Sequence, residues 1–145
     1  MEEITKKGQI AEHIAMADLI RYNFIPCSPT VNTSSFDIVG VRGKEILKVQ
    51  VKGFTFGNED KYKLTIKRPS SKQYRYTPDD YDILALVETD EQKVAYFPFI
   101  DQVKITMRRE RPTNLRGFQH RNTIYVFYDY LDIEQAIAKW KELSE

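Results

Sequence analysis

Two carboxylates, one amide and one amine within the first 52 residues are groups that could do chemistry together: Glu12, Asp37, Gln50 and Lys52. Carboxylate and amide oxygens are hard ligands suited to Mg²⁺. A bound Mg²⁺ would neutralise a phosphodiester and lower the pKa of a water molecule. An amine beside it would orient that water and stabilise the charge that develops. Together these groups predict a metal-dependent phosphodiesterase.

A hairpin is the element that must position three of these groups. Residues 36–41 and 46–53 both favour strands, and the four residues 42–45 between them are typical of a turn. In the second strand apolar and polar side chains alternate, which predicts one apolar and one polar face. The apolar set is Leu47, Val49 and Val51, and the polar set is Lys48, Gln50 and Lys52.

The pairing of the two strands decides where Asp37 lies. Side chains two apart on a strand share a face and lie about 6.6 Å apart, so Gln50 and Lys52 face the same way. Asp37 lies opposite Gln50 if the turn leaves four residues unpaired, and opposite Lys48 if it leaves two. Both registers bring Asp37 to the face of Gln50 and Lys52. Only a loop of odd length or a bulge would move it away.

The fourth group, Glu12, belongs to a helix predicted over residues 7–22. Spacing at 100° per residue gathers the apolar side chains on one broad arc. Glu12 lies between Met16 and Leu19 on that arc, so it should face the core. A buried carboxylate is costly unless something pairs with it, and the hairpin site could supply that partner. The arc consists of Ala11, Ala15, Met16, Leu19, Ile20 and Tyr22.

Each of these residues also has an ordinary structural explanation. Asp37 could be a strand-start carboxylate in water, and Glu12 could be stabilised by the helix N-terminus. Gln50 and Lys52 could line the solvent-facing side of a strand. The site hypothesis fails only if all these explanations hold together, so their conjunction favours a site.

The remaining elements follow from periodicity. The order of a helix, several mostly antiparallel strands and a helix indicates an α+β or mixed α/β fold. Asp132 is expected to cap the last helix, with Ile133, Ile137 and Trp140 as its buried stripe. Residues 101–121 are basic and unassigned. The other expected strands cover residues 61–67, 81–88, 93–99 and 123–130, with loops at 26–34 and 69–78.

The order of these residues resembles the PD-(D/E)XK nuclease superfamily. Glu12 on an N-terminal helix, Asp37 early in a strand and Gln50-Val51-Lys52 in the next strand carry the likeness. The chain length and the glutamine are similar to the small branch of group I intron-encoded homing endonucleases. The likeness implies an α/β (α+β) restriction-endonuclease-like core, with a mixed, mostly antiparallel sheet flanked by helices. We expect a single domain over residues 1–145, with the core at about 7–100 and a basic loop, strand and helix at 101–145.

The resemblance also implies a role for each residue. Asp37 would be the central metal ligand and Glu12 a second acidic ligand. Gln50 would take the usual acidic ligand position, the Val51 carbonyl would be a further ligand, and Lys52 would be the catalytic lysine. The cofactor would be Mg²⁺, with Mn²⁺ as a substitute. The proline expected just before Asp37 is absent, and the neutral Gln50 should weaken metal affinity, which leaves an inactive relative as an alternative.

Charge is segregated along a chain whose formal net charge is +1. Residues 41–76 carry 10 Lys/Arg against 3 Asp/Glu, and residues 102–128 carry 6 against 1. The acidic stretch 77–101 separates them. Two basic blocks permit a positive face for a polyanion such as double-stranded DNA. The candidate DNA-binding residues are Lys61, Lys63, Lys67, Arg68, Lys72, Arg75, Arg108, Arg109, Arg111, Arg116 and Arg121.

Composition excludes several other classes. One cysteine, Cys27, excludes a disulfide scaffold and a cysteine-based zinc site. No apolar run approaches the roughly 20 residues of a membrane span. The N-terminal residues lack a signal pattern, so we expect a cytoplasmic protein without a membrane partner.

The combined expectation is a site-specific, metal-dependent DNA endonuclease of the homing type that hydrolyses phosphodiesters. One active site per chain suggests a homodimer or a higher homo-oligomer for cutting both strands. Restriction-type, repair and Holliday-junction-resolvase-like nucleases remain alternatives. So do a catalytically inactive DNA-binding or protein-inhibiting relative and a plain protein-interaction domain.

Overall fold

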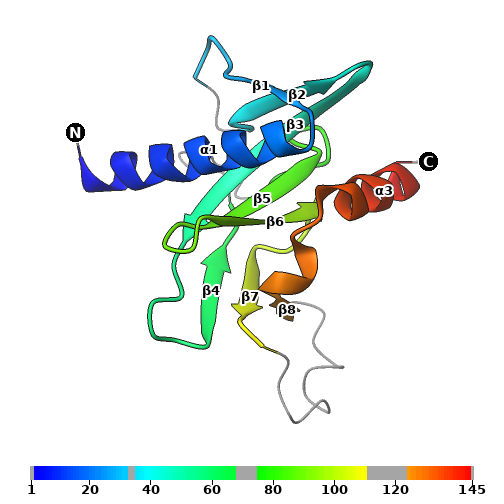
Figure 1. Cartoon of the computed structure of the whole chain (residues 1–145). Coiled ribbons are helices and arrows are strands. Elements are labelled where there is room, and N and C mark those ends of the chain that lie inside the picture. The colour runs from blue at the N-terminus through cyan, green and yellow to red at the C-terminus, as the bar shows by residue number, and fades with distance from the viewer. Residues whose placement is uncertain (1, 33–34, 68–74, 111–123, 145) are drawn as a thin grey trace.

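A computed structural model describes residues 2–32, 35–67, 75–110 and 124–144 of the chain. Within them the fold is α+β, with two sheets (Figure 1). The larger, sheet A, has five strands in the order β1-β2-β3-β5-β6. Its strands are β1 (Ile25–Cys27), β2 (Ile38–Arg42), β3 (Glu45–Phe54), β5 (Ile83–Glu88) and β6 (Lys93–Pro98).

Sheet A is mostly antiparallel, with one parallel pair at its centre, β3 and β5. All six residues of β5 are buried. A strand that is covered on both faces has apolar residues at consecutive positions. This is why the sequence of β5 shows little alternation between apolar and polar side chains. Its neighbour β3 alternates, with Leu47, Val49 and Val51 in the core on one face of the sheet.

The β2–β3 turn leaves two residues unpaired, Gly43 and Lys44, and the last pair of the ladder is Arg42 with Glu45. Gly43 has φ +61°, a conformation that favours glycine. Ile38 pairs with Val49, so the next step of the register brings Asp37 to Gln50. The expectation that a two-residue turn would set Asp37 against Lys48 was therefore wrong, because the turn is centred one residue later than that register requires.

Helix α1 (Glu3–Arg21) covers one face of sheet A (Figure 1). Ala11, Ala15 and Leu19 on its inner face are almost fully buried. The small side chains let the helix approach β3 closely at Gly53. A Cβ added to Gly53 would lie 2.9 Å from the Cβ of Ala11, so this glycine fixes the distance between α1 and β3.

Gly53→Ala should therefore destabilise the protein. The added methyl must displace α1, and overpacking of this kind typically costs about 1–3 kcal/mol. Thermal melts should show a lower Tm for Gly53→Ala, and the added change Ala11→Gly should recover part of the loss although a helical glycine itself costs up to about 1 kcal/mol. Strictly additive effects of the two substitutions would contradict the contact.

Sheet B has three strands in the order β4-β7-β8: β4 (Lys61–Thr65), β7 (Lys104–Arg108) and β8 (Ile124–Val126). It packs on the face of sheet A opposite α1 and closes a second core. Aromatic rings dominate this core: Phe54 meets Phe56 and Phe127 edge to face, with ring centroids 5.0 and 5.4 Å apart.

The chain ends with the 3₁₀ turn η1 (Phe127–Tyr130) and helix α3 (Ile133–Leu143). Asp132 caps α3 as expected, because its side chain accepts the Glu134 N–H at 2.9 Å. Ile133 and Ile137 are buried against sheet A. Arg42 donates to Glu134 and to Glu45, which ties α3 to the β2–β3 hairpin.

Several boundaries differ from the sequence expectations. Helix α1 begins at Glu3, one turn before residue 7, and the short β1 overlaps the start of the expected loop 26–34. The expected strand at 123–130 is only three residues of β8 followed by η1, and part of the unassigned stretch forms β7. The expected mostly antiparallel sheet is sheet A, and sheet B is a second one. No helix in the described ranges is long and apolar enough to cross a membrane.

Candidate active site

Asp37 lies directly before the first residue of β2 and beside β3. Its Oδ2 accepts two hydrogen bonds from β3: the Val51 N–H at 2.8 Å and the Gln50 Nε2 at 2.9 Å. Its own N–H donates to the Val49 carbonyl at 2.9 Å. The carboxylate is thus fixed to β3 by both main chain and side chain, with Oδ1 left for another partner.

Gln50 is 5% exposed, an unusual degree of burial for a side-chain amide. Its Nε2 donates to Asp37 and lies 3.4 Å from the Val51 carbonyl. Its Oε1 is buried and accepts no hydrogen bond from the described residues. A buried acceptor without a donor is costly, and Asp37 fixes the amide in this orientation because exchanging its O and N would set two oxygens against each other.

Lys52 follows Gln50 on the same face of β3. Its Nζ lies 5.8 Å from the centroid of the Tyr76 ring. Burial lowers the pKa of the Lys52 amine, and the charge of Asp37 opposes that shift. Tyr76 belongs to the segment before β5 and is itself buried. Its ring is the aromatic group that lies next to the Lys52 amine. No local sequence pattern connects Tyr76 to Lys52.

Glu12 on α1 is half-buried. Burial raises the pKa of the Glu12 carboxyl, and the negative charge of Asp37 raises it further. Burial also raises the pKa of Asp37, against the Val51 N–H and Lys52, which favour its ionised form. Two carboxylates that each disfavour ionisation, and that repel each other, form a place where added positive charge is stabilising.

A divalent cation fits this donor set. The described residues contain no group of three His, Cys, Asp or Glu side chains that could hold a metal. Oxygen donors of other kinds are present, however, because Gln50, whose Nε2 donates to Asp37, carries an Oε1 that accepts no hydrogen bond from the described residues. Hard oxygen ligands of mixed type, with a further carboxylate near, suit Mg²⁺. The observation that supports the fit is the buried amide oxygen without a donor.

The candidate DNA-binding residues are only partly gathered by the fold. Lys61, Lys63 and Arg108 share the outer face of sheet B. Arg75 faces Asp101 at 4.0 Å. Lys67 follows the end of β4 and is exposed. Five others lie outside the described residues: Arg68, Lys72, Arg111, Arg116 and Arg121.

Arg109 does not join this surface, because its side chain is used inside the chain. Its Nε and Nη2 donate to the carbonyls of Glu59 and Gly57 at 3.0 and 2.9 Å. The guanidinium also lies 4.8 Å from the Phe56 ring centroid. Arg109 therefore fastens the β3–β4 connection, and the DNA contact expected from its charge stays a prediction.

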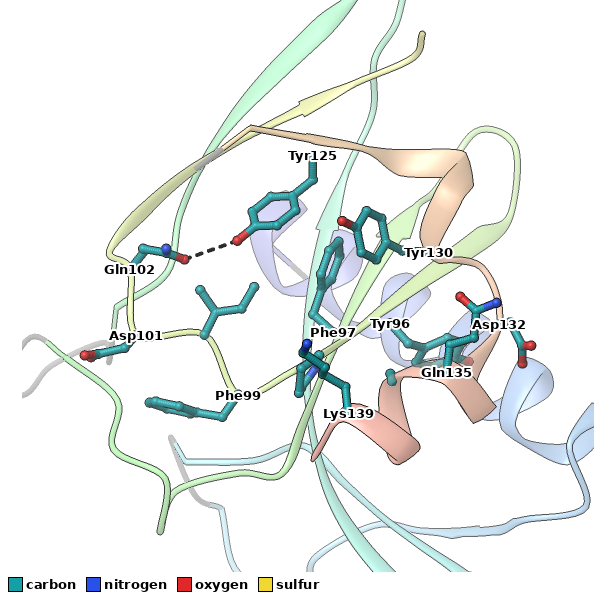
Figure 2. Close-up of a pocket in the computed structure, with 13 residues that line it drawn as sticks. Tyr96, Phe97, Phe99, Asp101, Gln102, Tyr125, Tyr130, Asp132, Gln135 and Lys139 are labelled. Atoms are coloured by element: carbon teal, nitrogen blue, oxygen red, sulfur yellow. Dashed lines mark hydrogen bonds between the residues drawn. The ribbon is translucent and has the colours of Figure 1, made fainter. Parts of the chain in front are cut away.

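A cavity of about 560 Å³ opens elsewhere, between β6, η1 and α3. Figure 2 shows the Phe97, Tyr125 and Tyr130 rings gathered along its wall, with Lys139 at the α3 side. Tyr125 donates to Gln102 at 3.4 Å across it. None of Glu12, Asp37, Gln50 and Lys52 lines this cavity, so the candidate catalytic groups lie outside it.

Comparison with known proteins agrees with the nuclease resemblance of the sequence. A family model described as PD-(D/E)XK endonuclease matches residues 3–130, and the chain belongs to this family. Among solved structures it is similar to a bacterial homing endonuclease, I-Ssp6803I, with a TM-score of 0.66 and 18% identity over 99% of this chain and 98% of that one. The likeness confirms the restriction-endonuclease-like fold. No curated protein sequence matches the chain.

Proposed function

We propose that the chain is a site-specific DNA endonuclease that depends on a divalent metal, Mg²⁺ with Mn²⁺ as a substitute. Membership of the PD-(D/E)XK endonuclease family supports the nuclease activity. The observation that carries the metal dependence is the buried Gln50 Oε1, which has no donor among the described residues and belongs to the amide whose Nε2 donates to the desolvated Asp37 carboxylate. Homing-type site specificity rests on likeness to the homing endonuclease alone.

The metal would be held by the Asp37 carboxylate and the Gln50 Oε1, with Glu12 and the Val51 carbonyl as further oxygen donors. When bound, the cation supplies charge that neutralises the phosphate and acidifies water. Val51 N–H holds the Asp37 carboxylate in place through Oδ2, which leaves Oδ1 for the cation. Lys52 Nζ orients the attacking water, and its lowered pKa eases the exchange of a proton at that nitrogen.

The substrate would be double-stranded DNA, bound by the basic residues outside the catalytic centre. Lys61, Lys63, Lys67, Arg75 and Arg108 are the described members of the proposed contact set, and Arg68, Lys72, Arg111, Arg116 and Arg121 complete it. We propose that residues 1–145 act as one nuclease domain. A homodimer or larger homo-oligomer would supply the second catalytic centre needed to cut both strands.

Cleavage of a long, sequence-diverse linear DNA tests this function. We expect discrete fragments that require Mg²⁺ or Mn²⁺ and disappear with EDTA. Four-way junctions cut in preference to linear duplex would favour a resolvase-like nuclease. Salt-sensitive binding without cutting would favour an inactive relative, for which the neutral Gln50 is the motivating residue. Absence of both binding and cutting would contradict the proposal.

A further inference from the structure

The outer face of sheet B brings together side chains that are far apart in the sequence. β4 and β7 pair antiparallel, so Lys61 lies opposite Arg108, Lys63 opposite Thr106, and Thr65 opposite Lys104. We call these six residues the basic ladder. The residues between them, including Leu64, Ile105 and Met107, face the aromatic core. On β4 and β7 the pattern separates an inner face that packs on the core from an outer face with four positive charges and no carboxylate. The third strand, β8, continues the outer face with Ile124 beside Thr106 and Val126 beside Arg108.

Four of the six residues of the basic ladder are exposed, and Thr106 and Arg108 are half-buried. Lys61, Lys63 and Lys104 are exposed and form no ion pair or hydrogen bond with the described part of the chain. Arg108 is half-buried, and its Nε is buried without a hydrogen-bond partner there. Elsewhere the chain pairs its arginines, as with Arg42. Unpaired cations on a regular surface indicate a polyanionic partner.

The dimensions of the basic ladder match one groove of duplex DNA. At about 3.4 Å per residue, five residues of strand span roughly 14 Å. This length corresponds to about four base-pair steps, since each step rises about 3.4 Å. The major groove is about 12 Å wide and admits a two-stranded β-ribbon, whereas the minor groove is about 6 Å wide. Lysine, arginine and threonine are also side chains that reach base edges in the major groove.

The basic ladder begins near the candidate catalytic centre and runs away from it. Ile66, which follows β4, lines a small pocket together with Tyr76. Tyr76 in turn lies beneath Lys52. The Thr65–Lys104 end is therefore the near end, and the Lys61–Arg108 end is the far one. Figure 1 shows β4 pointing toward sheet A from this far end.

We propose that the basic ladder lies in the major groove and reads base pairs to one side of the cleaved bond. Lys63 and Thr106, the pair at its centre, are the specificity-determining residues, and Lys61, Lys104 and Arg108 position the ribbon on the backbone. This inference rests on the proposed DNA endonuclease function. Three of the six residues of the basic ladder, Thr65, Lys104 and Thr106, were not candidate DNA-binding residues in the sequence. The pairing of β4 with β7 places them on the same face as the other three.

Selection of bound sites from a randomised duplex library tests the inference. The variants are Lys63→Met, which keeps the aliphatic stem, and Thr106→Val, which keeps the shape and favours a strand. Each should lose preference at one or two neighbouring base pairs by roughly tenfold to a hundredfold, the discrimination of one good base contact. Lys139→Ala, an exposed lysine on α3, is the matched control and should select the same sites as the unmodified chain. Thermal melts establish that each variant is folded.

Three outcomes would overturn the inference. If Lys63→Met weakens binding equally for all sequences and lowers the salt slope by about one, its contact is with phosphate. If both variants select the same sites as Lys139→Ala, the basic ladder does not contact DNA. If Lys63→Met and Thr106→Val do not fold, the test uses Lys61→Gln and Lys104→Gln, at the exposed ends of the basic ladder, in their place. An unchanged dependence of DNA affinity on salt in both of these variants would then overturn the inference. An unmodified chain that does not bind DNA would overturn the proposed function itself.

Discussion

Lys52→Ala is expected to lower DNA cleavage by roughly 10²–10⁴-fold, the usual contribution of a positioned proton-transfer group, while duplex binding stays nearly unchanged. Lys52 is the lysine whose charge acts on the Asp37 carboxylate. It is half-buried and does not lie on the basic ladder, so its loss removes little of the surface that would hold DNA. Cleavage rates at saturating DNA and Mg²⁺, with gel-shift affinities measured alongside, check both halves of this expectation.

Lys48→Ala is the matched control for this variant. Lys48 lies on the same face of the same strand, and its Nζ donates to the Asp79 carbonyl. This variant should cut at nearly the rate of the unmodified chain. Equal losses in Lys48→Ala and Lys52→Ala would point to a general effect on β3. Undiminished cleavage by Lys52→Ala would remove Lys52 from the mechanism.

The β2–β3 hairpin shows how much of the site the local sequence pattern alone can predict. Alternation along β3 predicted which side chains share a face, and the Gly43 turn limited the registers to those that bring Asp37 to that face. The contacts of Asp37 with Gln50 and Val51 lie within 14 residues of sequence. Short-range elements of this kind are specified by periodicity and turn chemistry.

Long-range pairings could not be predicted in the same way. Lys61 and Arg108 belong to segments 47 residues apart in number, and they become neighbours only because β4 pairs with β7. The use of Arg109 within the chain likewise depends on carbonyls at residues 57 and 59. A basic residue in the sequence carries no sign of whether its partner is a phosphate or the chain's own carbonyl. Tertiary contacts make that choice.

The position of Glu12 shows an intermediate case. Helical periodicity predicted a carboxylate on the inner arc of α1, and the side chain is half-buried. The distance between α1 and β3 depends on the paired small residues Ala11 and Gly53. Small residues have many uses in a sequence, so their contact was not predictable although it brings the helix, and with it Glu12, toward Asp37.

Asp37→Asn is expected to abolish metal-dependent cleavage and yet to raise Tm by a few degrees in buffer with EDTA. Burial raises the pKa of Asp37, so its ionised form is less favourable in the folded chain than in the unfolded one. The unfolding free energy therefore falls as pH rises through that raised pKa. Asparagine is neutral at every pH, and one amide oxygen at the place of Oδ2 can still accept both Val51 N–H and Gln50 Nε2.

Thermal melts with and without Mg²⁺ separate this stabilisation from the loss of the metal. The unmodified chain should gain about 2.7 kcal/mol at a metal concentration 100 times its Kd, and Asp37→Asn should gain little. Asp82→Asn is the control, because the Asp82 carboxylate also accepts a β3 N–H, that of Lys48 at 2.8 Å, and should leave the Mg²⁺ response intact. A Mg²⁺ response that survives in Asp37→Asn would place the cation elsewhere. A lower Tm in EDTA would mean that the hydrogen bonds of the ionised carboxylate outweigh its desolvation, because the two effects oppose each other at this one oxygen.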